Sequence, residues 1–205
     1  MGIYLNSKKL AERARNELRH FSEKSASYEG LNESFVFDEA IGEYDVFLSH
    51  RYADKEVVAG LALMLRDDYD LNVYVDWQCD NLNRKDVDRN TAKIIRDRII
   101  QSKTLLYVIS DSSMDSNWMP WEVGLMDGLK GRVAVCPLLV SNDNANAIGL
   151  EYLSLYPYVS NEKTDNGKEM LWINETESKY CTLKDWINGK SPIEEKNRRV
   201  EVCQN

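Results

Sequence analysis

The stretch "YDVFLSH" at residues 44–50 is a short, mostly apolar run that polar residues bound on both sides. Such a run is typical of a buried strand, because a strand covered on both faces carries few polar side chains. The preceding residues 25–34, "SASYEGLNES", are rich in Ser, Gly and Asn and predict a linker. A packed domain is therefore predicted to begin at about residue 43.

After this strand, apolar runs alternate with stretches of helical periodicity. The sequence predicts strands at residues 71–77, 103–110 and 132–140, and helices at residues 54–66, 84–102 and 116–128. In the second of these helices, Val87, Thr91, Ile94 and Ile95 are expected near the buried stripe. This alternation implies parallel strands joined by crossover helices, so the predicted fold class is α/β, with helices on both faces of the sheet.

Outside this core, the sequence predicts one more helix and a weakly patterned C-terminal part. Residues 7–24 are charged but carry one apolar stripe, formed by Leu10, Ala14, Leu18 and Phe21. This helix is expected to be a packing arm or an oligomerisation element, and a membrane-surface helix is the alternative. The predicted domains are residues 1–42, an N-terminal helix and linker, residues 43–190, the domain with a C-terminal extension, and residues 191–205, a charged tail.

Composition excludes several classes of protein. The 205 residues carry a net charge of −8, which argues against a nucleic-acid groove built from Lys and Arg. No apolar run approaches the roughly 18 residues that a membrane-spanning helix needs, and no signal-peptide core is present, so a cytoplasmic location is expected. The four cysteines form no C-x-x-C pair and only two histidines exist, so no metal site is expected.

Candidate site residues gather where the predicted strands end. The first strand ends in Ser49, His50 and Arg51, and the second in Asp76 and Trp77. Parallel sheets bind ligands at the carboxyl ends of their strands, and the third helix begins at the same edge. These residues are therefore expected to lie along one rim.

That third helix, in "SNWMPWEVGLMDG" at residues 116–128, carries Trp118 and Glu122 four residues apart on one face. Pro120 is compatible with the first helical turn. Glu122 has two interpretations: a surface acid favoured by the helix dipole, or an acid placed in a pocket for chemistry. The tryptophans are more often core residues than substrate platforms. No G-x-G-x-x-G or P-loop motif is present, so any nucleotide would be held outside the usual motifs.

Taken in order, these segments resemble the Toll/interleukin-1 receptor (TIR) domain. "YDVFLSH" is similar to its first box, "VYVDW" to its second strand and "SKTLLYVIS" to its third, while "SNWMPWEVG" resembles the segment in which TIR enzymes carry a Trp-x-x-x-Glu pair. The resemblance covers about residues 43–140. It implies a flavodoxin-like three-layer sandwich with a central, mostly parallel sheet, plus the N-terminal helix, and it looks most like bacterial TIR proteins.

Two functions follow from that resemblance. Many TIR domains of bacteria cleave NAD+ at the nicotinamide–ribose bond and release ADP-ribose signals, some of them cyclic, that activate a separate effector protein in Thoeris-like anti-phage defence. Other TIR domains are adaptors that act by homotypic contacts, and this is the alternative. The helical glutamate favours the enzyme. NAD+ would be the substrate, no cofactor is expected, and a homo-oligomer without nucleic-acid or membrane partners is expected.

The resemblance points to the Trp118–Glu122 pair, and the position and chemistry of the other rim residues suggest roles for them. Glu122 is the expected catalytic residue. Expected substrate-binding residues are Trp118, Trp77, Ser49, His50, Arg51 and Asp76. Trp118 would form a pocket wall, and Trp121, off that helical face, would contribute packing. The loop "WQCDNLNRKDV" after the second strand departs from the family because it lacks the usual Gly-rich character.

Overall fold

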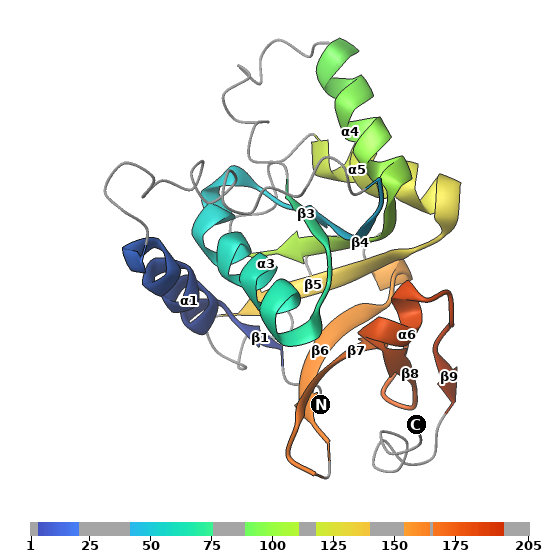
Figure 1. Ribbon diagram of the computed structural model, residues 1–205. Helices are drawn as coiled ribbons and strands as arrows, with labels where there is room; N and C mark the ends of the chain where they lie inside the picture. The colour runs from blue at the N-terminus through green and yellow to red at the C-terminus, as the bar shows by residue number, and fades with distance from the viewer. Residues whose placement is uncertain are drawn as a thin grey trace.

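The computed structural model describes residues 4–20, 42–75, 89–110, 118–139, 154–164 and 166–194. The elements in these ranges, labelled in Figure 1, are β1 (Leu5–Asn6), α1 (Ser7–His20), β2 (Tyr44–Ser49), the 3₁₀ turn η1 (Tyr52–Asp54), α3 (Lys55–Tyr69), β3 (Val73–Val75), α4 (Arg89–Gln101), β4 (Ser102–Ile109), α5 (Trp118–Lys130), β5 (Val133–Leu139), β6 (Tyr158–Lys163), β7 (Glu169–Asn174), β8 (Lys179–Thr182), α6 (Leu183–Ile187) and β9 (Ile193–Glu194).

The strands of these ranges form one sheet in the order β3-β2-β4-β5-β6-β7-β8-β9, and β1 pairs with β5 beside this path. The strands from β3 to β6 are parallel, as is the β1–β5 pair, whereas β7, β8 and β9 add an antiparallel extension. The predicted α/β fold with a mostly parallel sheet is confirmed. Each predicted parallel strand is present, because each is an apolar run rich in β-branched residues that both sheet faces bury.

Helices cover both faces of the sheet (Figure 1). Leu106 and Val108 of β4 share an apolar cluster with α1, α3 and α6. Leu105 and Tyr107, which alternate with them, share a second cluster with α4 and α5. The strand's two-residue period therefore assigns each side chain to one of two cores.

Helix α4 has a narrower buried stripe than the sequence predicts, and Val87 lies outside the described residues. Ile94 is 51% exposed, whereas Thr91, Ile95 and Ile99 are buried. The buried residues follow one another at intervals of four, so they form a single stripe along the helix. Ile94 lies next to Ile95 in the chain, about 100° around the helix, and falls outside that stripe.

The N-terminal helix packs on its own chain. Leu10, Ala11 and Ala14 of α1 are buried, and α1 lies against α3 (Figure 1). Arg13 donates hydrogen bonds to Asp68 at 2.6 and 2.9 Å, which ties α1 to the last turn of α3. Phe21, the last predicted stripe residue, lies outside the described ranges. Within those ranges, no helix has the length and apolar character needed to cross a membrane.

Helix α6 docks the C-terminal extension onto β4 and β5. The Trp186 indole N–H donates to Thr104 Oγ1 at 2.9 Å, and the Thr104 hydroxyl donates to the Arg132 carbonyl at 2.8 Å. The Arg132 guanidinium lies 4.4 Å from the centre of the Trp186 ring and donates to the carbonyls of Gly189 and Lys190. These contacts join the antiparallel extension to the parallel sheet.

Candidate functional site

The structure brings Ser49 and Glu122 together. Ser49 ends β2 and is 1% exposed, and Glu122 lies in the second turn of α5 and is 6% exposed. The Ser49 hydroxyl donates a hydrogen bond of 2.5 Å to Glu122 Oε2. A carboxylate that leaves water needs donors to offset its lost hydration, and the serine supplies one. The interpretation of Glu122 as a surface acid is therefore wrong.

The local sequence explains why Glu122 faces inward. Met119, Val123 and Met126 of α5 are buried in the core beneath the helix, at spacings of four and three residues. This stripe fixes the rotation of α5 on the sheet. Glu122 precedes Val123 and lies at the border of the stripe, where the end of β2 passes beneath it. Ser49 faces the same side as Phe47, two residues earlier, which belongs to the α5 core.

His50 and Arg51 follow directly on β2, at the carboxyl edge of the sheet. Both are half-buried. His50 Nδ1 lies 3.1 Å from the Leu48 carbonyl oxygen, and because a carbonyl only accepts, Nδ1 carries the proton in this contact. The Arg51 carbonyl accepts the Asp54 N–H at 2.9 Å, which closes the turn into α3. Their role in substrate binding stays a prediction.

The two tryptophans of α5 contact each other. The ring centres of Trp118 and Trp121 lie 5.6 Å apart at an angle of 81°, an edge-to-face arrangement. Both rings are partly buried against the α5 core. The predicted division between a pocket wall and a packing residue is therefore not visible in their burial. Asp76 and Trp77, the remaining predicted site residues, lie outside the described residues.

Sequence reasoning missed one buried carboxylate at this rim, Asp54. Asp54, at the start of α3, is 8% exposed and accepts a 2.6 Å hydrogen bond from the Ser110 hydroxyl, directly after β4. An Asp that precedes an amphipathic helix is ordinarily interpreted as an N-cap. Asp54 occupies that position, yet its side chain makes no capping hydrogen bond. The available signal was Ser110 at the end of an adjacent predicted strand.

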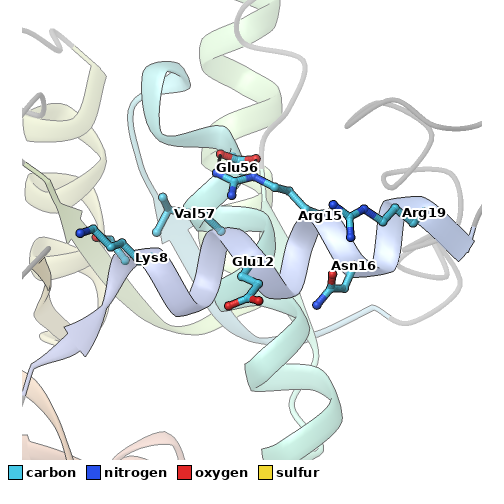
Figure 2. A pocket seen from close by; sticks show the side chains of 9 residues that line it. Lys8, Glu12, Arg15, Asn16, Arg19, Glu56 and Val57 are labelled. Atoms are coloured by element: carbon cyan, nitrogen blue, oxygen red, sulfur yellow. Dashed lines mark hydrogen bonds and ion pairs between the residues drawn. The ribbon is translucent and has the colours of Figure 1, made fainter.

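A surface pocket of about 530 Å³ lies elsewhere, between α1 and the start of α3 (Figure 2). Its lining is charged and includes Lys8, Glu12, Arg15 and Arg19. Arg15 of α1 donates hydrogen bonds of 2.6 and 3.0 Å to Glu56 of α3 and so links the two helices at this pocket. None of the predicted site residues lines this pocket, so it is separate from the Ser49–Glu122 pair.

The rim has the chemistry to stabilise positive charge. In a water-poor environment, a fixed carboxylate interacts with a developing cation more strongly than it would in bulk water. The Ser49 hydroxyl donates to one oxygen of the Glu122 carboxylate. Such an arrangement is suited to a reaction in which a sugar carbon becomes electron-poor.

Comparison with known proteins places the chain among its relatives. A family model described as TIR domain matches residues 46–171. The chain is 38% identical over 170 residues to a protein of Bacillus cereus (strain MSX-D12) named "Probable 3' cyclic ADP-D-ribose synthase ThsB'". The aligned residues make up 82% of this chain and 88% of that protein. It is also 34% identical over 82 residues to the "Putative cyclic ADP-D-ribose synthase TIR2" of Cytobacillus dafuensis, 39% of this chain but only 21% of that longer relative. The family match and the resemblance of the ordered strands agree: the chain belongs to the TIR domain family.

Proposed function

We propose that this protein cleaves NAD+ at the bond between nicotinamide and ribose and releases nicotinamide and a cyclic ADP-ribose signal in bacterial anti-phage defence. The observation that carries the proposal is the buried Glu122 carboxylate, held by Ser49 at the carboxyl edge of the sheet. Support comes from the 38% identity to a protein named as a cyclic ADP-D-ribose synthase, across most of both chains.

The chemistry needs one well-placed acid. When the carbon–nitrogen bond breaks, its electron pair leaves with nicotinamide, and the ribose carbon becomes an oxocarbenium-like cation. Nicotinamide is already cationic in NAD+, so its departure requires no proton. Glu122 stabilises the ribose cation or holds its hydroxyls. A nucleophilic atom of the same molecule then bonds to the ribose carbon and closes the ring, and it loses any proton that it carries to solvent.

The remaining rim residues would bind the substrate. Trp118 is proposed to wall the pocket and exclude water, and Trp77 to stack on a base or on the nicotinamide ring. His50, Arg51 and Asp76 are proposed to contact phosphates or ribose hydroxyls. Ser49 differs from these residues because its hydroxyl is directed to Glu122. We therefore propose that it positions the carboxylate.

The test is nicotinamide release from NAD+ by purified protein, alone and in lysate of phage-infected cells. Glu122→Gln and Glu122→Ala are expected to lower the rate by about a hundredfold or more, the scale seen when one transition-state contact is lost. Asp127→Asn, an exposed carboxylate on the same helix, is the matched control and should retain activity. Mass spectrometry of the products separates cyclic from linear ADP-ribose. Full activity in both Glu122 variants would contradict the assignment, and an inactive wild-type chain would favour an adaptor.

Two partners and a location belong to the same proposal. We propose that the chain acts in the cytoplasm, self-associates, and signals to a separate effector protein that senses the nucleotide product. If association completes the site, nicotinamide release per milligram should rise with protein concentration and level off once the assembly has formed. A constant specific activity over a wide concentration range would contradict the need for association.

A further inference from the structure

We infer that Asp54 and Ser110 form a latch that positions the Ser49–Glu122 pair for catalysis. The inference rests on the proposed function, since the reaction to be supported is NAD+ cleavage. Asp54 and Ser110 are positioning residues in this scheme: they act through the ends of β2 and β4 and make no contact with the reacting atoms.

The Asp54–Ser110 latch connects the chain segments that follow β2 and β4, the two neighbouring strands at the rim. Ser49, the last residue of β2, pairs with Tyr107 in the parallel register of β2 and β4, and β4 ends two residues later at Ile109. Asp54 lies five residues after Ser49, and Ser110 lies three residues after Tyr107. The 2.6 Å bond between their side chains therefore closes the gap between the chain segments that leave the two strands.

The carboxylates of Glu122 and Asp54 accept hydrogen bonds from Ser49 and Ser110, from opposite faces of the sheet. Ser49 faces α5, where the Glu122 carboxylate accepts a hydrogen bond from the Ser49 hydroxyl. Ser110 continues the alternation of Val108, which faces α3, and Asp54 stands at the start of α3. A displacement of either strand end would lengthen one of the two hydrogen bonds. Together the bonds fix the height and tilt of Ser49 relative to α5.

Asp54 is not needed to cap its own helix. Its side chain makes no N-cap hydrogen bond, although it occupies the position from which aspartate ordinarily makes one. It is instead 8% exposed and accepts the hydrogen bond from the Ser110 hydroxyl. The carboxylate is directed to the strand end in place of the helix terminus, which indicates a role at the rim.

Helix α3, which follows Asp54 directly, packs against α1. Arg15 of α1 grips Glu56 in the first turn of α3 with two hydrogen bonds (Figure 2). The Asp54 N–H closes the preceding turn onto the Arg51 carbonyl. The Asp54–Ser110 hydrogen bond therefore joins Ser110 to the start of α3, and α3 packs against α1. Loss of the Ser110 hydroxyl would release the end of β4, from which the chain continues toward α5.

The experiment compares serines at the two ends of β4. Ser110→Ala removes the latch, Ser110→Thr keeps a hydroxyl, and Ser102→Ala removes a buried hydroxyl that donates to the Arg98 carbonyl at 2.7 Å. Ser110→Ala should lower kcat about tenfold, with KM changed less than about twofold, because misplacement of a catalytic group costs rate more than binding. Ser110→Thr should restore most of kcat. Ser102→Ala should lower the melting temperature to a similar extent and leave kcat near the wild-type value.

A double-mutant cycle with Ser49→Ala separates positioning from a general structural effect. If the latch acts through Ser49, the losses of kcat from Ser49→Ala and Ser110→Ala should combine to less than their product. Equal kcat in Ser110→Ala and Ser102→Ala, or fully multiplicative losses, would overturn the latch while NAD+ cleavage stands. A wild-type chain that releases no nicotinamide under any condition would instead overturn the proposed function, and the latch with it.

Discussion

The backbone of α1 touches the backbone of α3 at Leu10 and Gly60. A Cβ atom added to Gly60 would lie 1.9 Å from the Leu10 carbonyl oxygen, far inside van der Waals contact. Glycine at position 60 is thus what allows the two helices to approach this closely. The apolar stripe of α1 is complementary to α3 because one of the two helices has no side chain at the crossing point.

Gly60→Ala should therefore destabilise the protein. The added methyl group must displace α1, and overpacking of this kind costs about 1–3 kcal/mol. Gly128→Ala on α5 is the matched control, because nothing lies within 4 Å of its added Cβ. Replacement of an exposed helical glycine by alanine raises the free energy of unfolding by about 0.5–1 kcal/mol. Urea unfolding of both variants tests the contrast, and a Gly60→Ala variant as stable as wild type would contradict this packing.

Ser49→Ala should reduce catalysis through the orientation of Glu122. Loss of the hydroxyl leaves a buried carboxylate with one donor fewer, and kcat should fall by about tenfold to a hundredfold. Steady-state nicotinamide release at varied NAD+ gives kcat and KM separately. A raised KM at unchanged kcat would instead indicate that Ser49 contacts the substrate, as its position after the first strand predicts from sequence.

Arg132→Lys should weaken the attachment of α6. The guanidinium stacks on Trp186 and donates to two carbonyls at once, and an ammonium cannot reproduce this planar geometry. The expected loss in the free energy of unfolding is about 1–2 kcal/mol. Arg96→Lys, on the exposed face of α4, should change stability little. Similar stabilities for the two variants would show that the stacking contributes nothing measurable.

Cys136 should make the fold sensitive to alkali. Burial raises the pKa of its thiol from 9.0 to about 12. The folded state therefore resists ionisation, and the stability that this thiol contributes is intact below about pH 9 and is lost as pH rises toward 12. The free energy of unfolding, measured in urea from pH 8 to pH 11, should fall more steeply for wild type than for Cys136→Ala. Parallel pH profiles would contradict this assignment.

Sequence alone predicts the parallel core well and the rim less completely. The bounds of β2 follow from a sharp change between apolar and polar residues, and α1 from its stripe. The sequence does not distinguish Ile94 from its neighbour Ile95, because both fit the apolar pattern of the helix. Only the packing of α4 on the sheet shows that Ile95 is the buried one. The sequence places Ser49, Glu122 and Ser110 near one rim but does not give their side-chain hydrogen bonds. The Ser49–Glu122 bond joins residues that are 73 positions apart and the Asp54–Ser110 bond residues that are 56 positions apart, so both depend on how the helices pack on the sheet.

The pairing of β1 with β5 affects which fragments of this protein can fold correctly. The family match begins at Val46, inside β2, and ends at Leu171, inside β7. A fragment with those limits would lose the strand beside Leu138, the helix over Gly60 and the indole of Trp186. It would bare a strand edge and apolar surface, both of which promote aggregation. Inactivity of such a fragment would therefore report misfolding, and conclusions about NAD+ cleavage should be drawn from protein that keeps residues 4–194.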